Sequence, residues 1–99
     1  MNKYIAIGHF KKDTGLETYT RSVVMENSTL KAFHQDLRGN GFVAYVTFTE
    51  KHWNRIKNLD GSFELYEAIK KLTANYRVWN EVTEYLGQCS DIIENHLAQ

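Results

Sequence analysis

Proline is absent from the 99 residues and cysteine occurs once, as Cys89. A single cysteine cannot form an intramolecular disulfide, which excludes the disulfide-stapled class of small secreted domains and fits a reducing cytoplasm. We expect Cys89 to pack as a small apolar residue. The short apolar run Ile5–Ile7 is followed by charged residues far too soon for a signal peptide or a membrane span. The sequence therefore predicts a cytoplasmic protein without a membrane segment.

Recognisable catalytic and metal-binding motifs are also absent. The four histidines, His9, His34, His52 and His96, show no metal-ligand spacing. The glycines of Gly39–Gly41 lie between an expected helix and an expected strand, the wrong order for a phosphate-binding loop. We therefore expect no catalytic residue, no metal and no cofactor. An enzyme whose site assembles only in the fold, such as a nuclease, stays open as an alternative.

Length and composition are those of one folded domain covering residues 1–99. The chain is 42% hydrophobic and 24% charged, which excludes wholesale disorder. A chain this short buries only a little over about 60% of the surface that its unfolded form exposes. We therefore expect the domain to be either modestly stable or stabilised by a partner, and homodimerisation stays open.

Three segments are rich in aromatic and β-branched residues and are predicted to be strands. They are residues 4–10, 17–25 and 42–48, and the turn-like residues 11–15 connect the first two as a hairpin. The third, FVAYVTF, is the most apolar run in the chain. We expect it to be buried on both faces, in the middle of the sheet.

Helical spacing of apolar residues occurs after the second and third strands. One helix is expected from Leu30 to Gly39, after the N-cap candidates Asn27, Ser28 and Thr29, and another after Thr49, ended by Asp60–Gly61. Ser62 then begins a long helical stretch, with a break at 73–75 or at Gly87. The predicted fold class is α+β: a small, mainly antiparallel three-stranded sheet in the order β-β-α-β-α-α, with helices packed on one face and a long helical C-terminal half.

The neutral total charge conceals an uneven distribution. Residues 1–77 hold all 12 basic and eight of the 12 acidic residues, a net charge of +4, whereas residues 78–99 hold four acidic and no basic residues, a net charge of −4. At about 100° per residue, the apolar side chains of this last segment share one side of a helix. They are Trp79, Val82, Tyr85, Leu86, Cys89, Ile92, Ile93 and Leu97.

The acidic residues of the last helix fall on its opposite side, as Glu81, Glu84, Asp91 and Glu94. A face without cations lacks the usual pairs between residues i and i+4, each worth a few tenths of a kcal/mol. One interpretation is an ordinary solvated face. The functional interpretation is a surface that binds a protein partner with a basic surface, including the basic region of a second copy of this chain.

Two clusters of basic residues could instead bind nucleic acid weakly and without sequence specificity. They consist of Lys51, Trp53, Arg55 and Lys57, and of Lys70, Lys71 and Arg77. Basic side chains next to an aromatic ring can hold a phosphate backbone and stack a base. The alternative, which we favour, places Trp53 in the core and the basic residues on a solvated face.

Three strings carry a resemblance that covers most of the chain: MNKYIAIGHFK, RGNGFVAYV and KKLTANYRVWNEVTEYLGQCSDIIE. They are similar to short reading frames of conjugative elements and prophages of Gram-positive gut bacteria, some of which encode anti-CRISPR proteins. The shared strings contain no catalytic motif. The resemblance implies a non-enzymatic inhibitor of host defence that acts on the RNA-guided nuclease of a type II system or on its guide RNA complex.

A nuclease of that kind has a positively charged channel for the guide and target strands. The acidic face is the feature of this sequence that could occupy such a channel, and it is inferred from spacing alone. Guide loading, target binding and cleavage all remain open as the inhibited step. The alternative function is a small nucleic-acid-binding accessory protein of a phage or conjugative element.

Overall fold

Three strands and four helices make up the part of the chain that the computed structural model describes, which is residues 1–11, 15, 17–59 and 63–99 without the side chain of Cys89. The predicted α+β class and order of elements are confirmed, with the long helical half divided into two helices. The elements are β1 (Asn2–Lys11), β2 (Thr18–Asn27), α1 (Leu30–Gly39), β3 (Phe42–Thr49), α2 (Glu50–Ile56), α3 (Phe63–Lys70) and α4 (Tyr76–Ala98).

The sheet is antiparallel, and its middle strand is β1, in the order β2-β1-β3. The expectation that residues 42–48 form the middle strand is wrong. Residues 4–9 of β1 are all buried, whereas Val43 of β3 is 55% exposed. Gly8 also fits a middle position, because a Cβ there would lie 2.2 Å from the backbone oxygen of Ala44 in β3.

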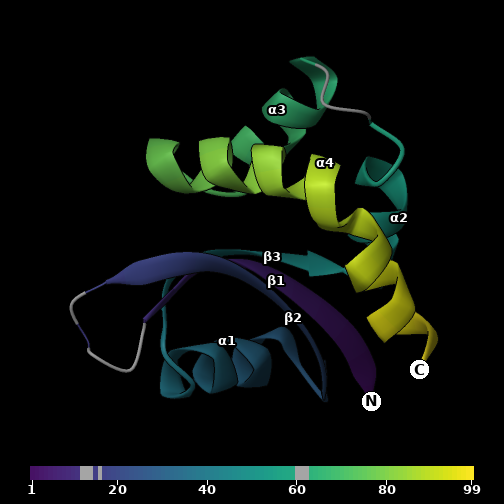
Figure 1. Ribbon diagram of the computed structural model, residues 1–99. Helices are drawn as coiled ribbons and strands as arrows, with labels where there is room; N and C mark the ends of the chain where they lie inside the picture. Colours follow the sequence, from purple (N-terminus) through teal and green to yellow (C-terminus); the bar gives the residue numbers. More distant parts are fainter. Residues whose placement is uncertain (12–14, 16, 60–62) are drawn as a thin grey trace.

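Helices cover both faces of the sheet, so the prediction that they pack on one face is wrong. Ile5 and Ile7 of β1 belong to the larger core, which α2, α3 and α4 complete. Tyr4 and Ala6, which alternate with them, belong to a second core that includes Phe33 of α1. Figure 1 shows α1 on one side of the sheet and α3 and α4 on the other. Neighbouring side chains of a strand point to opposite faces of the sheet, so the apolar side chains on each face of β1 need helices packed against them.

Polar side chains determine where three of the helices begin. Thr29, Thr49 and Asn75 each accept a hydrogen bond from the backbone N–H three residues later, which is N-capping. The Asn75 cap confirms the expected break at 73–75, and α4 continues through Gly87. The predicted stop at Asp60–Gly61, the Ser62 cap, part of the 11–15 turn and the packing of Cys89 lie outside the described residues.

Helix α4 crosses one face of the sheet and then descends towards the start of β1 (Figure 1). Val78, Val82 and Ile93 on its inner side are buried in the larger core. At its end, Lys3 Nζ donates hydrogen bonds to the backbone oxygens of Leu97 and Gln99, at 2.6 and 2.9 Å. Within the described chain, no helix combines the length and the apolar character that a membrane crossing requires.

Candidate partner-binding surface on α4

The four carboxylates of the predicted acidic face lie on α4, but they do not share one surface. At about 100° per residue, Glu84 and Asp91 are opposite the packing side, whereas Glu81 and Glu94 flank it on its two borders. The border pair is half-buried and the outer pair is exposed. The two pairs therefore have different roles.

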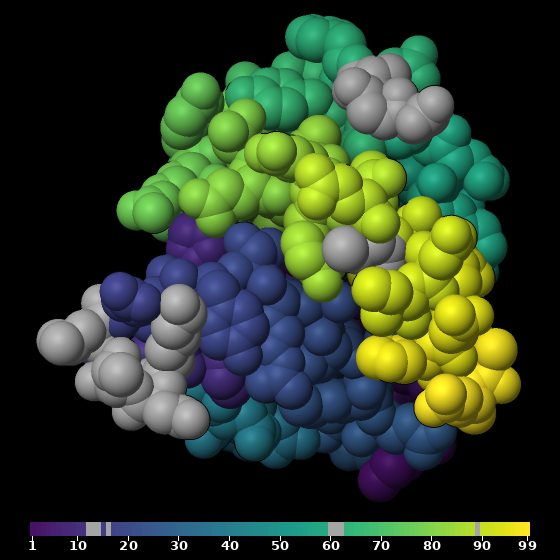
Figure 2. Space-filling model, in the orientation of Figure 1, coloured from purple at the N-terminus to yellow at the C-terminus, as the bar shows by residue number. Residues whose placement is uncertain are grey.

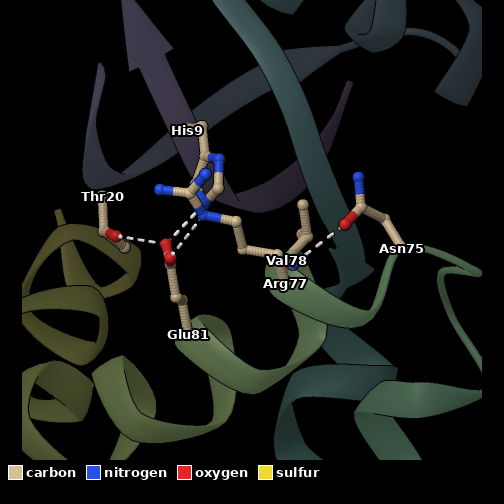
Figure 3. Close-up of polar contacts among 6 residues, drawn as sticks. All are labelled: His9, Thr20, Asn75, Arg77, Val78 and Glu81. Carbon is tan, nitrogen blue, oxygen red and sulfur yellow. Dashed lines mark hydrogen bonds and ion pairs between the residues drawn. The ribbon is translucent and has the colours of Figure 1, made fainter. Parts of the chain in front are cut away.

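Glu81 connects α4 to the sheet. Its carboxylate receives hydrogen bonds from His9 Nε2 on β1, from Thr20 Oγ1 on β2 at 3.4 Å and from Arg77 Nε at 3.2 Å (Figure 3). His9 is only 9% exposed. Burial would raise the pKa of Glu81, but the hydrogen bonds from Arg77 and His9 outweigh it and lower the pKa. This carboxylate is thus engaged inside the fold.

Glu94 makes the corresponding connection to α2. It accepts hydrogen bonds from Trp53 Nε1 at 2.7 Å and from Lys57 Nζ at 3.1 Å. The bond from Trp53, followed by that from Lys57, lowers the pKa of Glu94 and outweighs its partial burial. Glu94 therefore satisfies the indole N–H of a buried tryptophan, a structural role that spacing alone does not reveal.

Glu84 and Asp91 remain available to a partner. Within the described part of the chain, neither carboxylate has a hydrogen-bond or ion-pair partner, and both residues are exposed. Each lines a different cleft. Glu84 lies in one of about 330 Å³ between α4 and β2, with Thr20, Glu81, Tyr85 and Gln88. Asp91 lies in one of about 250 Å³ beside α2, with Lys57, Asn58, Ser90 and Glu94.

The residues of the two predicted basic clusters also have different roles in the fold. Trp53 is wholly buried, so the prediction that it stacks on a base is wrong, and the alternative that it belongs to the core is confirmed. Lys57 and Arg77 are paired with Glu94 and Glu81. The remaining basic residues of the two clusters are exposed: Lys51, Arg55, Lys70 and Lys71.

The exposed basic residues do not form one patch. Lys51 lines a cleft with residues of β1, and Lys70 Nζ lies 5.8 Å from the centre of the Trp79 ring. Arg55 and Lys71 do meet, together with His52, around a cleft of about 270 Å³ between α2 and α3. The other residues that line this cleft are apolar: Ile56, Leu59, Ala68 and Leu72.

The donor sets of metal sites are a further point of comparison for the described side chains. No group of three or more histidine, cysteine, aspartate or glutamate residues among them could hold a metal ion. The chain matches no protein-family model, no curated protein and no solved structure. Its function has to be inferred from the contacts, exposure and charge of these residues.

Thr20, Tyr85 and Gln88 line the cleft beside Glu84, and sequence reasoning did not select them. Thr20 lies on β2, distant in sequence from the two α4 residues. Only the packing of α4 over β2 brings them together. The sequence does show that Thr20 is a polar residue at the more exposed end of β2. That observation does not identify a binding cleft unless the position of α4 is known.

Proposed function

We propose that this protein is a non-enzymatic binding protein that recognises a basic surface of a protein partner through Glu84 and Asp91 of α4. The observation that carries the proposal is that these two exposed carboxylates have no partner within the described chain. Residues 78–99 contain no lysine or arginine, and Lys57, which lines the cleft beside Asp91, is paired with Glu94. Complementary charge accelerates association and selects the partner more than it adds affinity. Glu81 and Glu94 are each paired with a cation inside the fold and keep those contacts.

The partner that we propose is the RNA-guided nuclease of a type II system, alone or with its guide RNA, in the bacterial cytoplasm. The sequence resemblance to reading frames of mobile elements supports this choice, which would make the protein an anti-CRISPR protein. The positively charged nucleic-acid channel of such a nuclease is complementary to α4. A protein in that channel would block guide or target strands without any chemistry of its own.

The test is binding of the purified protein to purified nuclease, with and without guide RNA, together with cleavage of target DNA. The double variant Glu84→Gln/Asp91→Asn should bind roughly tenfold more weakly, since each partly exposed ion pair contributes up to about 1 kcal/mol, and should inhibit cleavage correspondingly less.

The matched control is Asp36→Asn/Glu64→Gln, which removes the same charge from exposed positions on α1 and α3. It should bind as the unmodified protein does. Equal binding by all three proteins would refute the role of Glu84 and Asp91 in binding the partner. No binding to the nuclease in either form would refute the choice of partner.

A second candidate function is weak nucleic-acid binding, and one observation favours it. Arg55, Lys71 and His52 converge on the cleft between α2 and α3. Phosphate contacts there would make affinity fall steeply as salt rises. Titration of single-stranded DNA, double-stranded DNA and RNA at low salt, against Arg55→Gln/Lys71→Gln, tests it. An absence of binding at low salt would eliminate this function.

A further inference from the structure

The outer edge of β2 is bare along the described chain. β2 is an end strand of the sheet and pairs with β1 through all ten of its residues, Thr18–Asn27, without a register shift. It contains no proline. In Figure 2 the atoms of β2 form the middle of the visible face, between α4 above and α1 below. A regular, uncovered edge presents unpaired backbone N–H and C=O groups, which are a template for a further strand.

The α4 side of this edge is suited to a cation. A strand added next to β2 would direct every second side chain towards α4. There it would meet the polar cleft formed by Thr20, Glu81, Glu84, Tyr85 and Gln88. Glu81 is already paired with His9 and Arg77, so Glu84 is the carboxylate of this cleft that could pair with a lysine or arginine of the added strand. The exposed Glu26, near the other end of β2, faces the same side.

The α1 side of the same edge is suited to apolar side chains. Val23 and Met25 face this side, opposite Ala6 and Tyr4 of β1, and pack against the smaller core while remaining half-buried. Nearer the other end of the strand, Tyr19 is 42% exposed, and Arg21 on the same side lies over the Phe10 ring, 4.5 Å from its centre. An apolar side chain of an added strand would cover this partly exposed surface. The two sides together specify an alternating sequence.

We infer that β2 accepts an extended segment of the partner as a fourth strand, with lysine or arginine towards α4 and apolar residues towards α1. This inference deepens the proposed function and rests on it, because it identifies which part of a basic partner is bound. Backbone hydrogen bonds supply the attachment in this mode of recognition, and alternate side chains supply the specificity.

A second copy of this chain fits the edge less well. The side chains that β2 directs towards α4 include Thr20, Ser22 and Glu26 but no cation. Antiparallel pairing of two β2 strands about a twofold axis would also place both α4 helices on one face of the joined sheet. Glu84 of each copy would then lie on the same side as that of the other, where like charges repel.

The experiment uses the full chain and a labelled synthetic peptide of alternating lysine and valine, as long as β2, with fluorescence anisotropy to measure affinity. Hydrogen exchange should show new protection of β2 amides. Glu84→Gln should weaken binding by up to about fivefold, as expected for one partly exposed ion pair. The matched variant Asp91→Asn loses the same charge two helical turns further on, at the cleft beside α2, and should bind unchanged.

Two further peptides separate strand addition from simple charge attraction. Alternate backbone N–H groups of a strand face its neighbour, so N-methylation of one alternate set should abolish binding, and N-methylation of the other set should not. A peptide of the same composition with its lysines in one block should bind more weakly. Equal binding by all peptides, equal effects of the Glu84 and Asp91 variants, or no peptide binding would overturn the inference.

Failure here is distinguishable from failure of the proposed function. If the nuclease binds and the Glu84→Gln/Asp91→Asn variant does not, while the peptide never protects β2, the proposed function is supported and strand addition is overturned. If the peptide binds in the expected register but the nuclease does not bind, the chemistry of the edge is supported and the choice of nuclease is overturned.

Discussion

Removal of the Glu81 carboxylate should destabilise the fold far more than removal of the neighbouring Glu84 carboxylate. In Glu81→Ala, His9 loses its partner in a nearly buried site, which costs about 1–3 kcal/mol. The bond to Arg77, whose side chain is 78% exposed, adds about 0.5 kcal/mol. The free energy of unfolding should therefore fall by about 2–3 kcal/mol, which for a domain of this size lowers Tm by roughly 10–20 °C.

Glu84→Ala is the matched control for this prediction. It lies three residues further along the same helix, is exposed and has no partner in the described chain. Both substitutions bring the same gain in helix propensity, so the difference between them isolates the contacts of Glu81. Differential scanning calorimetry should show Glu84→Ala within about 0.5 kcal/mol of the unmodified protein. Equal changes in Tm for the two variants would refute the connection between α4 and the sheet.

Three other outcomes are expected. Trp53→Phe keeps a buried ring but removes the N–H bonded to Glu94, and urea denaturation should show a loss of about 1–2 kcal/mol; no loss would mean that the bond contributes nothing. Burial raises the pKa of Glu81 but the hydrogen bonds from Arg77 and His9 outweigh it, and the hydrogen bonds from Trp53 and Lys57 lower the pKa of Glu94, so both pKa values lie below the ordinary glutamate value. The stabilisation by these carboxylates is present above the unfolded-state pKa and is lost as the pH falls through the folded-state pKa. Glu81→Gln/Glu94→Gln should therefore flatten the acid limb of a plot of Tm against pH, and an unchanged limb would contradict this. Gly8→Ala places a Cβ against the backbone of β3 and should lower the free energy of unfolding by more than about 3 kcal/mol. Gly87→Ala, with no atom within 4 Å of its Cβ, should stabilise α4 by about 1 kcal/mol. Thermal melts in which Gly8→Ala has the higher Tm of the two would contradict both placements.

The sequence predicted the elements well and the arrangement of the sheet poorly. Asn75 is a strong N-cap residue, so the break before α4 followed from local chemistry. Apolar content alone is a poor measure of burial in this sheet, because the most apolar run, residues 42–48, forms an end strand. The better signal lay in residues 4–8, where apolar side chains of both parities are followed by a glycine that allows the close approach of β3. That pattern indicates a strand covered on both faces.

The sequence predicted which carboxylates lie on α4, but not which of them share an exposed surface. Helical spacing correctly placed Glu84 and Asp91 on the outer side of α4. It did not show that Glu81 and Glu94 lie near enough to the packing side to bond His9 and Trp53. Their partners come from β1 and α2, distant in sequence, so only tertiary packing determines which carboxylates stay available.

The contact between His9 and Glu81 spans 72 sequence positions, and this has a consequence for the folding kinetics. Contacts between residues so far apart in sequence form slowly, because the intervening chain has to be closed first. A chain that has formed its sheet and α1 but has not yet docked α4 still exposes Ile5, Ile7 and Val46. Such a species has an apolar face and an open edge at once, the combination that leads to aggregation. Docking of α4 therefore ends the period in which the folding chain is prone to aggregate. Variants that slow this docking should lower the soluble yield on refolding even where their Tm is unchanged.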